Sequence, residues 1–134
     1  MKIKSFAFLF IFFLAGVVFA QDLNAYRTWV RYHTMTRGAV LEEMYIEKNA
    51  MDFLKKNGTL PEDTSIVMDE FSQDSKILRR IITMQKLGKT WKFKEFKADK
   101  TQNIAESGER CFSCHQSSVS GEDIVFTLEK IKNF

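Results

Sequence analysis

The feature that most restricts what this chain can fold into is a five-residue motif near its C-terminus, Cys111-Phe112-Ser113-Cys114-His115. The spacing C-x-x-C-H is the attachment signature of c-type haem. Two cysteines three residues apart lie on one side of a helical turn, so both thiols can reach the two vinyl groups of one porphyrin, and the next histidine meets the iron. The motif therefore predicts one haem c, held covalently through Cys111 and Cys114, with His115 as an axial ligand of the iron.

Three other uses of the same cysteines fit the sequence less well. A thioredoxin-like motif is expected early in a βαβ unit, whereas this motif lies close to the C-terminus. A structural zinc site needs four ligands, and the chain has only two cysteines and two histidines. A disulfide between Cys111 and Cys114 would close so short a loop that it would add little stability.

The N-terminus has the three parts of a secretory signal peptide. Two lysines precede an apolar run over residues 6–19, and Ala20 stands before the expected cleavage site. The run is shorter than the roughly 20 residues that span a bilayer, which argues against an uncleaved membrane anchor. We therefore expect residues 1–20 to be a cleaved signal and residues 21–134 to form one soluble haem domain in the periplasm, because C-x-x-C-H acquires haem outside the bacterial cytoplasm.

The charge of the chain gives no indication of nucleic-acid binding. The formal charge of +3 falls to +1 when the two signal-peptide lysines are removed. One stretch is nevertheless lysine-rich, and it allows two interpretations: a basic surface that steers an acidic redox partner, or a charged strand edge that resists pairing. We favour the second. These lysines are Lys86, Lys89, Lys92, Lys94, Lys97 and Lys100.

Periodicity predicts both helices and strands after residue 20. Helices are expected at residues 24–33, at 49–56, and at 103–115 with a break at Gly108. Strands are expected at residues 40–46, 65–71, 78–85, 91–97 and 123–128. Short links between consecutive strands favour an antiparallel sheet. The predicted fold class is therefore α+β: a predominantly antiparallel sheet with a few short helices around one covalently bound haem.

The late position of the motif bears on the sixth iron ligand. Small electron-carrying cytochromes c have the motif early and a methionine far downstream, but no methionine or histidine follows His115 here. The upstream candidates are His33, Met35, Met44, Met51, Met68 and Met84. Methionines on strands and helices usually pack in the core, and His33 is expected on a buried helix face. We therefore expect a five-coordinate iron with an open or apolar distal side.

The C-terminal part of the chain resembles the cytochrome P-460 and cytochrome c′-beta family. The specific similarity is Cys111-Phe112-Ser113-Cys114-His115 followed by Asp123-Ile124-Val125-Phe126-Thr127. Supporting similarities upstream are Tyr26-Arg27-x-Trp29, Gly58-x-x-Pro61 and Trp91-x-Phe93-x-x-Phe96. The resemblance implies an antiparallel β-sheet fold around one haem, and a five-coordinate iron that binds small ligands such as nitric oxide.

One departure from the family matters. In the P-460 branch a lysine on the strand after the Gly-to-Pro link is cross-linked to the porphyrin, and those proteins oxidise hydroxylamine. Met68 stands at the corresponding place here, and a thioether cannot form that bond. The resemblance therefore favours the gas-binding c′-beta branch, with Met68, Phe71 and Phe93 as pocket residues. Glu70 is a candidate for a polar distal group that handles protons.

Three functions remain open from the sequence. The leading hypothesis is a periplasmic mono-haem cytochrome that binds nitric oxide or a similar diatomic or nitrogen-oxide ligand. The second is an enzyme that oxidises hydroxylamine or reduces peroxide with the help of Glu70. The third is a six-coordinate electron-transfer cytochrome with an acidic redox partner, and a homodimer is left open. A helical-bundle cytochrome c′ is the alternative architecture, against which the alternation over residues 65–97 argues.

Overall fold

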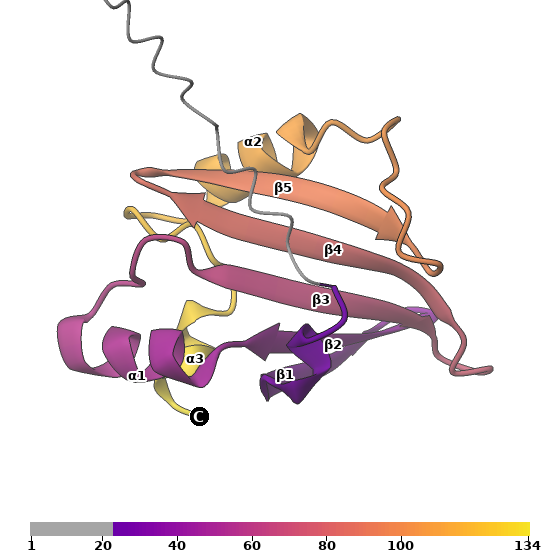
Figure 1. Ribbon diagram of the computed structural model, residues 1–134, viewed down its shortest axis with the longest axis horizontal. Helices are drawn as coiled ribbons and strands as arrows, with labels where there is room; N and C mark the ends of the chain where they lie inside the picture. Colours follow the sequence, from indigo (N-terminus) through magenta and orange to yellow (C-terminus); the bar gives the residue numbers. More distant parts are fainter. Residues whose placement is uncertain (1–22) are drawn as a thin grey trace, which may run out of the picture.

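The computed structural model describes residues 23–134 as a single antiparallel sheet flanked by short helices (Figure 1). The predicted signal peptide lies outside the described residues. No helix within residues 23–134 is long and apolar enough to cross a membrane. In chain order the elements are a 3₁₀ turn η1 (Tyr26–Thr28), β1 (Val30–Arg37), β2 (Val40–Ile46), α1 (Lys48–Asn57), β3 (Ser65–Ser72), β4 (Leu78–Leu87), β5 (Thr90–Lys97), α2 (Glu109–Ser118) and α3 (Leu128–Lys132).

The five strands pair in the order β1-β2-β3-β4-β5, each antiparallel to the next. Two-residue loops at 38–39 and 88–89 join β1 to β2 and β4 to β5, which is the commonest length of a hairpin connection. Helix α1 ends at Gly58, whose φ of +79° and N–H bond to Leu54 O terminate the helix as expected. The predicted antiparallel α+β architecture is confirmed.

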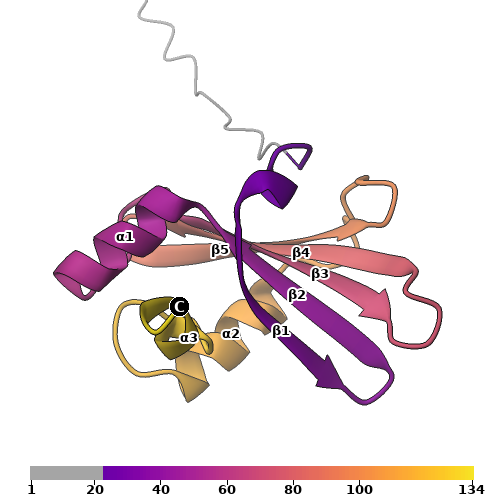
Figure 2. The same cartoon turned by 90° about the horizontal axis from the view of Figure 1, so that it is seen from below.

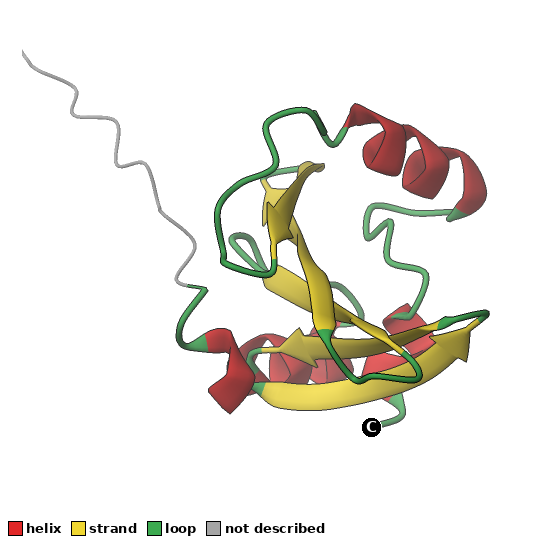
Figure 3. Ribbon diagram, turned by 90° about the vertical axis from the view of Figure 1, so that its right-hand side faces the viewer, coloured by secondary structure: helices red, strands yellow, loops and turns green. Residues whose placement is uncertain are grey.

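Each strand alternates between two faces of the sheet. Ile66 and Met68 of β3 contact one hydrophobic core, to which the three α-helices contribute, whereas Val67 packs in a second, smaller core on the opposite face. Figure 2 shows η1 on one side of the sheet and α2 and α3 on the other. The sheet is bent, and the C-terminal helices lie on its concave side (Figure 3).

The smaller core contains a buried carboxylate. Asp69 is fully buried, and it accepts a hydrogen bond from Tyr26 Oη at 2.5 Å and pairs with Arg27 at 3.0 Å. Burial raises the pKa of Asp69, although these two partners oppose the shift. The contacts tie η1 to the face of the sheet that lies away from α2.

Two predicted elements were wrong, and a third was right only after its predicted break at Gly108. In the segment predicted as a helix over residues 24–33, only η1 is helical, and His33 lies in β1 because the backbone from Val30 onward pairs with β2. Residues 123–128 make no sheet pairing, since the Asp123 side chain binds the loop after α1. Residues 103–108 are not helical, because Asn103 N bonds to Glu95 O of β5, so α2 begins only at Glu109.

Candidate functional site

A cavity of about 610 Å³ lies between the concave face of the sheet and α2. This volume is within the range of about 300–1,000 Å³ that is typical of ligand and cofactor sites. All five strands contribute side chains to one wall, and α2 and residues 125–127 contribute to the other. Residues of the sheet and residues of the C-terminal motif therefore line the same cavity.

The three chemically important residues of the motif line this cavity together. Cys111, Cys114 and His115 lie on α2, one helical turn apart or less. Both cysteines are free thiols; Cys111 is half-buried and Cys114 is exposed. Burial, with a contribution from nearby Glu106, raises the pKa of the Cys111 thiol. Two thiols and an imidazole therefore face one cavity from a single helix, as the motif predicts.

Gly108 allows α2 to begin close against β5. Its φ is +80°, in the left-handed region that favours glycine, and it directly precedes α2. A Cβ atom at this position would stand 2.3 Å from Phe93 O. The first turn of α2 therefore packs on the β5 backbone only because residue 108 has no side chain, and this contact sets the position of the motif relative to the sheet.

The His115 ring is held from three sides. The ring centroid of Phe93 lies 4.8 Å from that of His115, and that of Phe126 lies 4.5 Å away. His115 Nδ1 is 2.8 Å from Ile124 O. Because a carbonyl oxygen only accepts, Nδ1 must carry the proton, which leaves the Nε2 lone pair for a ligand. Burial lowers the pKa of His115, and the bond to Ile124 only partly opposes this.

Four methionines form much of the sheet side of the cavity. They come from four consecutive strands: Met35 of β1, Met44 of β2, Met68 of β3 and Met84 of β4. Met44 and Met68 are directly paired across β2 and β3. Thioether side chains are flexible and polarisable, so this wall is apolar and adaptable.

One end of the cavity is polar. Glu42 is 2 % exposed, lines the cavity and pairs with Arg37, which also lines it. The prediction from sequence missed Glu42. The signal that could have revealed it is strand parity: Glu42 shares its face of β2 with Met44, whereas Glu43 faces the other way and bonds to Tyr45 Oη.

Four predicted candidates are not among the residues that line the cavity. Phe71 follows Val67 and Asp69 on the other face of β3, so strand alternation turns it away. Glu70 is buried but bonds to Arg80 at 2.8 Å, beside the cavity. His33 and Met51 also lie outside the lining, the latter in the core under α1. Met68 and Phe93 do line it.

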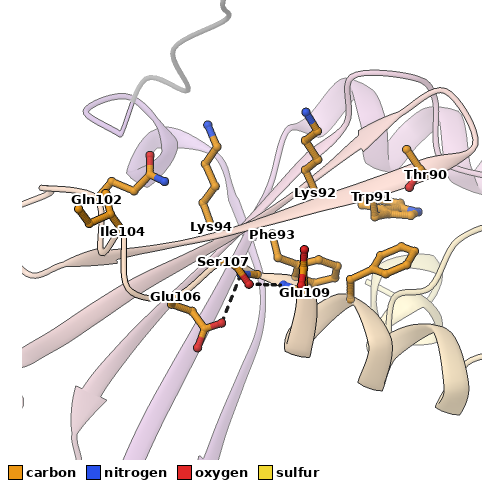
Figure 4. A pocket seen from close by; sticks show the side chains of 12 residues that line it. Thr90, Trp91, Lys92, Phe93, Lys94, Gln102, Ile104, Glu106, Ser107 and Glu109 are labelled. Atoms are coloured by element: carbon orange, nitrogen blue, oxygen red, sulfur yellow. Dashed lines mark hydrogen bonds between the residues drawn. The ribbon is translucent and has the colours of Figure 1, made fainter.

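The lysine-rich stretch is divided by the structure. Lys86 is 2 % exposed and pairs with Asp123, so it cannot contribute to a basic surface. Lys92 and Lys94 point to the opposite side of β5 from Phe93 and border an open groove of about 500 Å³ (Figure 4). Glu106 and Glu109 line the same groove, so its charge is mixed. An acidic redox partner stays a prediction.

Comparison with known proteins places this site in a family. No curated protein matches the chain significantly. A family model described as Cytochrome P460 matches residues 23–127, a range that contains all five strands, α2 and the cavity-lining residues after it. The name is that of a haem-binding cytochrome, and the cavity carries an imidazole of the kind that binds haem iron. Since the match covers most of the sequence, the chain belongs to the cytochrome P460 family.

Proposed function

We propose that the protein is a mono-haem c-type cytochrome whose five-coordinate iron binds small neutral ligands such as nitric oxide. Cys111 and Cys114 would hold the haem covalently, and His115 Nε2 would bind the iron. The observation that carries the proposal is the meeting of these three side chains in one cavity, opposite an apolar wall. The haem supplies an iron centre that can take a diatomic ligand.

The residues of the chain have separable roles in this proposal. The carbonyl of Ile124 fixes the His115 tautomer, and Phe93 and Phe126 restrict rotation of the ring. The thioethers of Met44 and Met68 present no hydrogen-bond donor to an anion or to water. The methionine wall of the cavity therefore favours small apolar ligands over charged ones.

The experiment is a ferrous absorption spectrum of the holoprotein with and without nitric oxide, run beside four variants that change only the thioethers: Met35→Leu, Met44→Leu, Met68→Leu and Met84→Leu. Leucine conserves volume and cannot bind iron. A high-spin spectrum that is the same in all five proteins is expected. A low-spin spectrum that becomes high-spin in one variant would instead identify a methionine ligand and favour electron transfer.

We also propose that residues 1–20 direct export to the periplasm and are then removed. The support is the basic start, the apolar run and the small residues before Gln21. Mass spectrometry of protein from the periplasmic fraction should show an N-terminus at Gln21. Protein that stays in the cytoplasm, or keeps residues 1–20, would contradict this proposal.

A second function is favoured by one observation, the buried carboxylate of Glu42 on the cavity wall. A carboxylate within reach of a bound substrate can act as a general acid or base, which would suit reduction of peroxide or oxidation of hydroxylamine. Met68 occupies the position of the lysine that is cross-linked in the hydroxylamine-oxidising P-460 branch. Peroxide is therefore a better substrate to test than hydroxylamine. If the protein turns over peroxide, Glu42→Gln should lower kcat by about 10²-fold or more, with Glu70→Gln as the control.

A further inference from the structure

A buried ion pair lies behind the cavity, outside its lining. Lys86 Nζ of β4 is 2.8 Å from Asp123 Oδ1, and both side chains are nearly inaccessible to solvent. Burial lowers the pKa of Lys86, but hydrogen bonds to Asp123 and Glu122 outweigh it, so the pKa is raised and the lysine stays charged. The pair is therefore a buried charged junction, which Glu122 extends toward the surface through its own contact with Lys86 at 3.0 Å.

The second carboxylate oxygen of Asp123 joins another part of the chain to this junction. Asp123 Oδ2 accepts bonds from Leu60 N at 2.7 Å and Thr59 Oγ1 at 2.8 Å, and Lys86 Nζ also donates to Leu60 O at 2.8 Å. We call these four residues the Lys86–Asp123 clamp. The clamp joins the loop after α1, strand β4 and the C-terminal segment at a single carboxylate.

Ile124, which follows Asp123, carries the carbonyl that accepts a hydrogen bond from His115. Val125 N bonds to Asp123 O at 2.8 Å, an i→i+2 bond that makes Ile124 the centre of a tight three-residue turn. On the N-terminal side of Asp123, Trp91 Nε1 donates to Glu122 O at 3.2 Å. With both neighbours of Ile124 held, the direction of its carbonyl is fixed, and that carbonyl accepts from His115 Nδ1.

We propose that Lys86 and Asp123 are positioning residues for His115, acting through the Ile124 carbonyl. The inference rests on the proposed role of His115 as the iron ligand. Groups that accept from the distant nitrogen of a ligating histidine orient the ring and raise its basicity. Loosening the clamp should therefore weaken the Nδ1–H bond, reduce electron donation by the imidazole, and raise the reduction potential of the iron.

A purely electrostatic or purely structural role predicts a different result. In Asp123→Asn a negative charge is lost, which by charge alone raises the potential. In Lys86→Met a positive charge is lost, which by charge alone lowers it or, if Asp123 then takes up a proton, leaves it unchanged. Only the positioning role predicts a rise in both variants. A clamp variant that is less stable but has an unchanged reduction potential would indicate that the clamp has only a structural role.

The test is potentiometric titration of the holoprotein for wild type, Asp123→Asn, Lys86→Met and the control Lys132→Met. The control removes one positive charge from an ion pair in which Lys132 is partly exposed and Glu129 is exposed. A higher potential in Lys86→Met than in both wild type and Lys132→Met supports the proposal; an equal or lower one overturns it. Should both clamp variants fail to fold, Thr59→Val removes one bond to Asp123 without changing charge. A smaller rise is then expected, and no rise overturns the proposal.

Failure of the proposed function would look different. The His115→Ala variant would then keep the absorption spectrum and the potential of wild type, which would show that His115 does not bind the iron. A clamp variant that behaves like its control while His115→Ala loses its native spectrum would overturn only the clamp.

Discussion

Substitution of Gly108 by alanine should destabilise the protein by about 1–5 kcal/mol, the sum of backbone strain and overpacking less the gain from a stiffer unfolded chain. The left-handed φ of +80° costs an L-residue about 1–2 kcal/mol. The new Cβ would also lie 2.3 Å from Phe93 O and 2.9 Å from Phe93 C. Both are backbone atoms that cannot rotate away, so overpacking adds about 1–3 kcal/mol.

Gly38 provides the matched control. It has a φ of +60°, and a Cβ there would meet nothing within 4 Å. Gly38→Ala therefore carries the backbone strain without the contact, and the loss of unfolded-state entropy, about 0.4–1 kcal/mol in favour of alanine, is common to both variants. The difference between the two variants should thus be about 1–3 kcal/mol.

The assay is urea unfolding of the holoproteins followed by far-ultraviolet circular dichroism, with covalent haem content measured on the same samples. Gly108→Ala should have the lower midpoint, and it should retain less haem because α2 carries the attachment residues. If Gly108→Ala is no less stable than Gly38→Ala, the contact of α2 with the β5 backbone does not set the position of the helix.

Three further outcomes follow from the site. Replacing Cys111 and Cys114 together by serine should give protein without covalent haem, seen as loss of the haem-bearing mass in denaturing mass spectrometry; a retained mass would refute thioether attachment. His115→Ala should keep the covalent haem but lose the native spectrum. Tyr32 of β1 also lines the cavity. Burial raises the pKa of Tyr32 to about 12 from 10.0, despite an opposing bond from Thr127. The folded state therefore binds the Tyr32 proton more tightly than the unfolded state does. The resulting contribution to the free energy of unfolding is complete below pH 10, and about 2–3 kcal/mol of it is lost as the pH rises toward 12. Unfolding midpoints measured across this range should fall less in Tyr32→Phe than in wild type, and equal slopes would contradict the assignment.

Much of the sheet could be predicted because its strands carry local signals. Ile66, Val67, Met68 and Asp69 alternate between the two cores, and the strand they predict is β3. The turn at Gly58 likewise ends α1 where its sequence indicates. These signals depend on neighbouring residues alone.

The errors arose where distant contacts decide the conformation. Asp123 and the residues after it have the composition of a strand, but the carboxylate binds Leu60, far away in the chain, and turns the segment from the sheet. The spacing of apolar residues over 24–33 predicts a helix that includes His33, but pairing with Met44 of β2 places His33 in β1. Glu42 could not be placed from local signals, because a cavity wall exists there only once α2 and residues 125–127 form its other side.

The pairing of the strands in chain order has a consequence for how the protein is made. Each strand pairs with the one synthesised just before it, so the whole sheet can form once β5 has been made. The wall that completes the cavity, formed by α2 and residues 125–127, is translated after all five strands. Without α2 and residues 125–127, the cavity has no wall opposite the sheet. If haem is attached to α2 as proposed, that attachment would be a late step of folding, and it would join the haem to the wall opposite the sheet.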